Sequence, residues 1–181
     1  MRALAATILA VSTTALAACA GMTAEAPLTV ALGQQRAAAE SDLHAHQYCR
    51  ESNDPPQRQE VYPRCDRPGT EWGDSWVAAV FEHDQLVELR RWERYSDDAH
   101  AVERWNQLVG DRSKITPPSE AAAQALRERG LLQPGTRTVR AFQVDDRTIV
   151  GVYLLTPSEP ENATVLEKVS FLPDSLAPTQ K

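Results

Sequence analysis

Apolar residues from Trp76 onward include five runs of strand length, bounded by polar segments. A strand-length apolar run, a polar turn and a second run make up the pattern of a β-hairpin. Two such pairs and a last single run are present, which predicts two hairpins and a final strand, at 76–81 and 86–92, at 136–144 and 148–155, and at 165–172. The two hairpins resemble each other, through either duplication or chance.

Apolar residues between the two hairpins recur at helical spacing. Val102, Trp105 and Leu108 share one face of a helix that Ser96 can cap at its N-terminus. Gly110 follows this stripe, where a glycine is typical of a helix end. The pattern predicts a helix that begins after Ser96 and ends at Gly110.

A second helix is expected from Ser119, another N-capping residue, to Arg129. Gly130 suits the left-handed position that follows a helix, and Leu126 and Leu131 are placed for the hydrophobic contact of such an ending. A modest helix is also expected within 34–48, which contains three consecutive alanines and no proline.

These elements predict an α+β fold, with an antiparallel sheet of about five strands and helices on one face. We expect one domain over 34–172 and a frayed tail over 173–181. The proline-containing stretch 50–75 is expected to be loop. An alternative is a compact core at 76–172 with a loose segment before it.

The N-terminus has the features of an export signal. Arg2 precedes an uncharged apolar stretch, 3–18, which is too short for a comfortable transmembrane helix. The tetrapeptide 16–19, Leu-Ala-Ala-Cys, then resembles the lipobox of bacterial lipoproteins. The resemblance covers the first 19 residues and implies that 1–18 is a signal peptide, removed so that Cys19 becomes a lipid-bearing first residue. The alternative is an ordinary secretory signal with a chance cysteine.

The resemblance also implies where the protein lies. Residue 20 is alanine rather than aspartate, which in lipoprotein sorting points to the outer membrane, with the domain facing the periplasm. Several acyl chains give stable attachment where one does not. Residues 19–33 are predicted to be a lipid-anchored tether, because they carry little charge and no long apolar run. The membrane, reached through this anchor, is the first expected partner.

Cys49 and Cys65 remain as an even pair once Cys19 is assigned to the lipid. In an exported protein the expected state of such a pair is a disulfide. It would clamp the loop 49–65 and contribute about 3 kcal/mol for about 16 residues in the chain-entropy model. The alternative is a thiol or metal site.

A metal site is the alternative use of the cluster Asp42, His44, His46 and Cys49. On a helix the two histidines point in nearly opposite directions, because they are two residues apart. We therefore expect no metal here, and no motif in the sequence indicates another cofactor.

Catalytic motifs are not found in the sequence: it has no GxSxG, no HExxH and no glycine-rich phosphate loop. His83 and His100 have acidic neighbours, so a small hydrolase or a ligand-binding domain that uses either of them is the rival hypothesis. The formal charge of −6 argues against nucleic acid as a partner.

The densest chemical feature is a run of arginine and aromatic residues. Arginine and tryptophan are enriched where proteins bind one another, which makes this cluster the candidate partner-binding surface: Arg91, Trp92, Arg94, Tyr95 and Arg104. The alternative is an ion-paired, solvated face above buried tryptophans. The sequence therefore predicts a non-enzymatic lipoprotein of the cell envelope that binds an envelope protein.

Overall fold

The computed structural model describes residues 25–50, 55–65, 75–156 and 163–172. Its centre is a six-stranded antiparallel sheet with the strand order β1-β2-β3-β6-β5-β4. The strands are β1 (Gln59–Pro63), β2 (Ser75–Glu82), β3 (Gln85–Tyr95), β4 (Thr136–Gln143), β5 (Thr148–Leu155) and β6 (Ala163–Phe171). The helices are α1 (Arg36–Ala45), α2 (Asp98–Ile115) and α3 (Glu120–Glu128).

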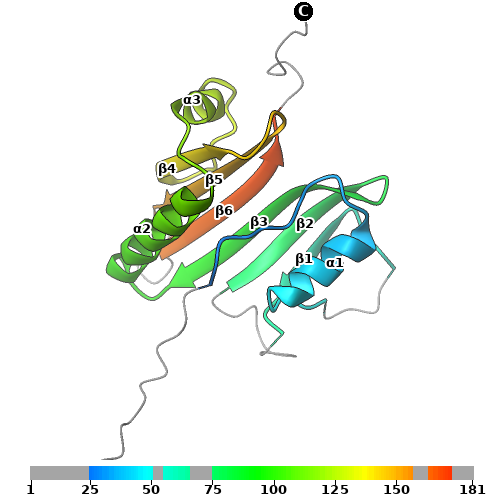
Figure 1. Ribbon diagram of the computed structural model, residues 1–181. Helices are drawn as coiled ribbons and strands as arrows, with labels where there is room; N and C mark the ends of the chain where they lie inside the picture. Colours follow the sequence, from blue (N-terminus) through cyan, green and yellow to red (C-terminus); the bar gives the residue numbers. More distant parts are fainter. Residues whose placement is uncertain (1–24, 51–54, 66–74, 157–162, 173–181) are drawn as a thin grey trace, which may run out of the picture.

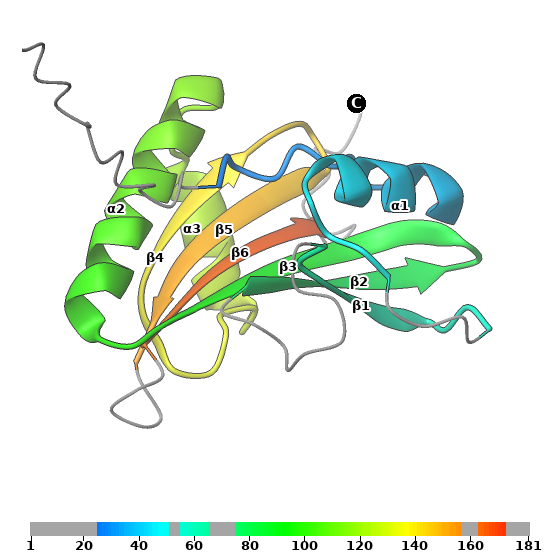
Figure 2. The ribbon, with the colours of Figure 1, turned by 90° about the horizontal axis from the view of Figure 1, so that it is seen from below.

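The two faces of the sheet are covered differently. One face carries α1, α2 and the extended segment 25–33, which runs between the two helices (Figures 1 and 2). On the other face α3 packs over β4, β5 and β6 around Tyr153 and Leu166. The other half of that second face, over β1, β2 and β3, is not covered by a helix of the described chain.

The α+β class with an antiparallel sheet is confirmed, and two details differ from the expectation. α3 lies on the face opposite to α1 and α2. The sheet has a sixth strand, β1, inside the stretch expected to be loop. β1 forms because it pairs with β2 over its whole length and buries Glu60 and Tyr62 against α1.

The segment 25–33, called the strap below, belongs to the folded domain. The sequence assigned it to the tether, but Leu28 and Val30 are 2% and 4% exposed and lie in the main core. At its end, Gly33 donates a backbone hydrogen bond to Leu86. Cys19, the predicted signal peptide 1–18 and the predicted frayed tail 173–181 lie outside the described residues.

Local signals set several element ends as predicted. Gly130, with φ +63°, follows α3, and its N–H bonds to Arg127 while that of Leu131 bonds to Leu126. These two bonds are those of a Schellman ending. Ser119 accepts from the N–H of Ala122 and caps the start of α3.

α2 differs from its expected bounds at both ends. Its N-cap is Asp97, which accepts from the N–H of His100, rather than Ser96. The helix passes through Gly110 and continues to Ile115, because Leu108 and Arg112 are both buried and keep this turn packed on the sheet. No helix among the described residues is long and apolar enough to cross a membrane.

Candidate functional site

The strand β3 divides the predicted arginine–aromatic cluster between the two faces of the sheet. Successive side chains of a strand point to opposite faces. Arg91 and Tyr95 therefore point toward α2, and Arg104 of α2 meets them there. Trp92 and Arg94 point to the face that carries α3. The five residues form two separate sites rather than one surface.

On the covered face, five buried charged residues form a network: Arg91, Arg104, Arg112, Glu93 and Glu167. The Arg91 side chain is 1% exposed, with Nη2 2.8 Å from Glu167 and Nε 3.1 Å from Glu93. Arg104 holds the same Glu93 through two hydrogen bonds, Nε to Oε2 at 2.6 Å and Nη2 to Oε1 at 2.9 Å. Arg112 donates to the other oxygen of Glu167. Each buried acid thus has two arginine partners.

The network also binds the main chain of the strap. Arg91 donates to the carbonyl of Ala26 at 2.7 Å, Arg104 to that of Glu25 at 2.8 Å and Arg112 to that of Leu28 at 2.6 Å. In return, the N–H of Leu28 donates to Glu167 at 3.1 Å. Four hydrogen bonds to charged groups therefore fix the backbone of 25–28 on the sheet.

The side chain of Glu25 extends this network toward the edge of the sheet. Its carboxylate accepts from the Tyr48 hydroxyl and from Arg64. Burial raises the pKa of Tyr48 well above its ordinary value, so the phenol stays protonated and remains a donor. Glu25, the first residue that the structure describes, is therefore bonded to Arg64, directly after β1.

Electrostatics keep the buried groups charged. Burial alone would raise the pKa of Glu93, but the hydrogen bonds from Arg104 and the charges of Arg91 and Arg104 outweigh it and lower this pKa. Burial alone would lower the pKa of Arg91, yet Glu167 and Glu93 outweigh it and raise that pKa. The network consists of ion pairs rather than neutral groups, which makes each charge dependent on its partner.

The uncovered half of the other face contains an open groove of about 430 Å³. At its centre the rings of Trp76 and Trp92 stack, with 6.2 Å between centroids and 10° between planes. The guanidinium of Arg94 lies 5.1 Å from the Trp76 ring, on which it stacks as a cation. The groove is lined by Gln59, Val61, Trp76, Ala78, Arg90, Trp92 and Arg94. None of these described lining residues is acidic.

Both histidines of the hydrolase hypothesis are exposed, and each has an acidic neighbour among the described residues. His83 is exposed, at φ +51° in the two-residue turn between β2 and β3, beside Asp84 at φ +64°. The depression next to it is lined by charged, apolar and amide side chains, with no serine or cysteine among its described residues. His100 is exposed on α2, and its hydrogen bond to Asp97 raises its pKa.

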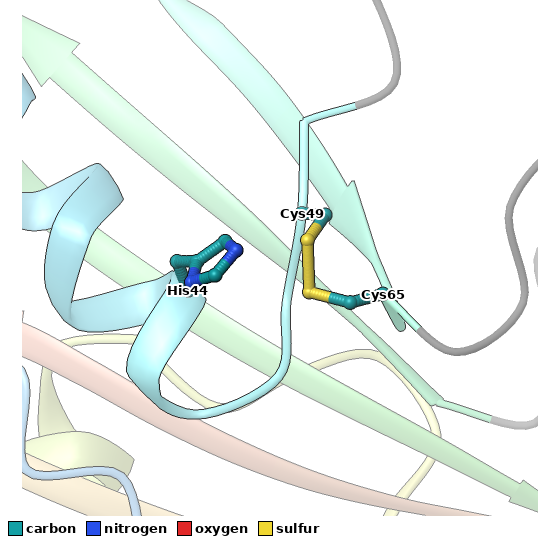
Figure 3. A group of neighbouring side chains, drawn as sticks. All are labelled: His44, Cys49 and Cys65. Atoms are coloured by element: carbon teal, nitrogen blue, oxygen red, sulfur yellow. A yellow bond between two sulfur atoms is a disulfide. The ribbon is translucent and has the colours of Figure 1, made fainter.

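The disulfide Cys49–Cys65 is formed in the structure, as predicted, and joins the segment after α1 to the end of β1. Figure 3 shows His44 beside it, with a ring nitrogen and both sulfurs within 4.8 Å of one another. Cysteine binds a metal as a thiolate, and the two sulfurs here are joined in a disulfide, which leaves His44 as the one available ligand of this group. Asp42 and His46 bond elsewhere, to Gln34 and Thr29.

Sequence reasoning missed half of the buried network: Glu25, Arg112 and Glu167. One signal was present for Glu167. It lies between Val165 and Val169 at two-residue spacing, so it shares their face of β6, and that face is core. An acidic residue in such a register indicates a buried ion pair. Comparison of the chain with protein-family models, curated protein sequences and solved structures finds no match.

Proposed function

We propose that this protein is a lipid-anchored, non-enzymatic binding module of the bacterial cell envelope, and that its partner docks in the groove of the uncovered sheet face. The observation that carries the proposal is the Trp76–Trp92 pair, which stacks in a groove and stays half-buried, although Trp92 also touches the core under α3. Tryptophan and arginine contribute most to binding where they lie at the centre of an interface. Half-buried tryptophans beside arginines supply that combination.

The charge of the groove indicates the chemistry of the partner. Its described lining carries two arginines and no acid, in a chain whose formal charge is −6, and the one described acid that reaches Arg90 is Glu88 beside the lining. A protein segment with acidic side chains next to an apolar or aromatic one would add to the charge pairing at this edge of the groove, where Arg90 already holds Glu88, and would cover the indole rings. The proposed partner is therefore an acidic segment of another envelope protein.

Attachment to the membrane is the second part of the proposal. It rests on the order of Arg2, the apolar stretch 3–18 and Cys19, with Ala20 favouring the outer membrane and a domain that faces the periplasm. The rival function, a hydrolase or ligand-binding domain that uses His83 or His100, has less support. Both side chains are exposed, and neither lines the groove.

The anchor is tested with Cys19→Ser. Without the acceptor for the acyl chains, this variant should leave the membrane fraction and show no lipid mass. A variant that still partitions into detergent with the mature mass of the wild type would refute the lipid anchor.

The groove is tested by photocrosslinking in cells from Gln59, an exposed residue at its rim, with Asp146 in the β4–β5 turn as the matched position outside it. We expect one crosslinked partner from 59 and none from 146. Arg94→Glu should abolish the product, whereas Arg140→Glu, the same charge change on β4, should leave it. Equal products from both positions, or no effect of Arg94→Glu, would contradict docking in the groove.

A further inference from the structure

Among the described residues, one group brings three side chains that can ligate a metal close together. A ring nitrogen of His44 and the sulfurs of Cys49 and Cys65 all lie within 4.8 Å of one another (Figure 3). His44 is exposed and both cysteines are partly exposed, so the group is open to solvent. It shares no described residue with the lining of the groove.

The backbone that carries the two cysteines is held together by hydrogen bonds as well as by the disulfide. The N–H of Cys49 donates to the carbonyl of Pro63 at 2.9 Å, and the N–H of Cys65 donates to that of Gln47 at 2.9 Å. Tyr48, which lies between these two bonds, is 1% exposed and anchors the segment in the core. These contacts do not involve a sulfur, so opening the disulfide leaves the two segments paired.

His44 is positioned by the last turn of α1. Its carbonyl accepts from the N–H of Gln47 at 2.9 Å, and the N–H of Tyr48 bonds to the carbonyl of Leu43 at 2.9 Å. Gln47, at φ +64°, reverses the chain here, so that the segment after the helix passes beside the imidazole (Figure 3). The backbone therefore holds all three side chains in place, which is the condition for a preorganised site.

We propose that, once a protein dithiol has reduced the disulfide, His44, Cys49 and Cys65 bind one Zn²⁺ ion, with water in the fourth position. Zinc takes thiolate ligands at about 2.3 Å and imidazole ligands at about 2.0–2.1 Å in a tetrahedron, so its ligand atoms lie about 3.5–3.8 Å apart. Side-chain rotations bring the three atoms to that separation. Two thiolates balance the charge of Zn²⁺, and this described group holds no carboxylate of the kind that Mg²⁺ or Ca²⁺ prefers.

The change from disulfide to metal site proceeds by thiol–disulfide exchange. A thiolate of the reductant attacks one sulfur, which breaks the Cys49–Cys65 bond and forms a mixed disulfide. The second thiol of the reductant then displaces this cysteine, so the reductant leaves as a disulfide and has supplied two electrons. Its two protons pass to Cys49 and Cys65, and both are released when the thiols bind Zn²⁺. The partial exposure of both cysteines gives the reductant access.

The experiment uses the unlipidated Cys19→Ser protein, in which Cys49 and Cys65 are the remaining cysteines of the chain. One sample stays oxidised, and the other is reduced with a phosphine and desalted without oxygen. Co²⁺ is the first probe, because cobalt held by thiolates in a tetrahedral site absorbs in the near ultraviolet and the visible, and Zn²⁺ then displaces it. We expect the reduced protein to bind one ion per chain, to release two protons per ion, and to bind about 100-fold more tightly than the oxidised protein.

His44→Ala and His46→Ala are the matched variants. His46 lies two residues further along the chain, outside the group, and its ring nitrogen is 3.2 Å from the Thr29 hydroxyl. Loss of an outer-shell partner weakens metal binding by about 10–100-fold. In the reduced protein His44→Ala removes a ligand itself, so it should weaken Zn²⁺ binding by about 100-fold or more, whereas His46→Ala should leave the affinity unchanged.

Near-ultraviolet circular dichroism reports whether the reduced protein keeps its fold. Zn²⁺ should raise the urea midpoint of the reduced protein and leave that of the oxidised protein unchanged, because only the reduced fold binds the ion. Equal affinities of the reduced and oxidised forms, or of the two histidine variants, would overturn the proposal. Reduced protein that is unfolded with and without Zn²⁺ would overturn it as well, since the site depends on the paired segments. None of these outcomes depends on the lipid anchor or on the groove.

Discussion

Replacing Glu167 with glutamine should strongly destabilise the protein, because two buried arginines share this acid. Its carboxylate is 2.8 Å from Arg91, bonds to Arg112 and accepts from the N–H of Leu28. Glutamine has nearly the same volume, so the substitution removes a charge and creates no cavity.

The expected loss is about 3 kcal/mol in the free energy of unfolding. Removing one partner of a buried ion pair costs about 3–5 kcal/mol, since the other charge is left without compensation. The lower end applies because Arg91 keeps Glu93 and Arg112 keeps the carbonyl of Leu28. For a domain with a total stability of about 5–15 kcal/mol, such a loss is a large fraction.

Urea denaturation of the unlipidated Cys19→Ser protein measures this loss. With a urea m-value of about 1–3 kcal/mol/M, the midpoint should fall by about 1–3 M with little change in slope. Arg137→Gln is the control, because it breaks an exposed pair with Asp98, worth about 0–1 kcal/mol. Equal shifts in the two variants would refute the account of the network.

A double-mutant cycle tests whether the buried charges act together. Arg112→Met alone should also destabilise, because Glu167 loses one partner. Combined with Glu167→Gln, it should cost less than the sum of the two single changes by about 0.5–3 kcal/mol, since the second change removes a charge that the first left unpaired. Additive losses would show that Arg112 and Glu167 do not interact.

Three further predictions concern pH, the disulfide and two glycines. The pKa of Glu93 is lower in the folded protein than in the unfolded chain, so the charged carboxylate stabilises the fold above its unfolded pKa of about 4.3, and this stabilisation is lost as the pH falls through the folded pKa. The urea midpoint of Glu93→Gln should therefore decline less steeply below about pH 4.3 than that of the wild type. An unchanged decline would contradict this. Replacing both Cys49 and Cys65 with alanine should cost about 3 kcal/mol of stability in urea, and two alkylatable thiols in unreduced native protein would show that the bond is absent. Gly151→Ala should cost about 1–3 kcal/mol, because its Cβ would lie 2.5 Å from a tyrosine ring. Gly110 lies in a helix with open space around it, so Gly110→Ala should raise the free energy of unfolding by about 1 kcal/mol. Thermal denaturation compares the two glycine variants. Shifts of the same sign would contradict the packing described.

Features with local causes could be predicted from the sequence. Both hairpins follow from strand-length apolar runs around polar turns. The two bounds of α3 follow from Ser119 and Gly130, whose hydrogen bonds reach only three to five residues along the chain. The disulfide follows from counting the cysteines of a chain whose N-terminus predicts export. In each case the cause lies within a few residues along the chain or in the number of cysteines.

The tertiary structure decided what depends on distant partners. β1 is a strand because β2 lies beside it, although its own sequence contains a proline and few apolar residues. α2 continues past Gly110 because Arg112 reaches Glu167, 55 residues away. No property of 98–115 alone reveals that contact.

The candidate site shows the same division. The sequence identified Arg91, Trp92 and Arg94 as chemically unusual, but it grouped them as one surface. It did not reveal that Arg91 would bind a carbonyl of the strap, 65 residues earlier, or that Trp92 would stack on Trp76. A backbone carbonyl is the same in every residue, so a segment held mainly through its main chain leaves little trace in its sequence. The fold brings three arginines to that backbone, and for this reason a segment that its sequence predicts to be a tether is part of the folded domain.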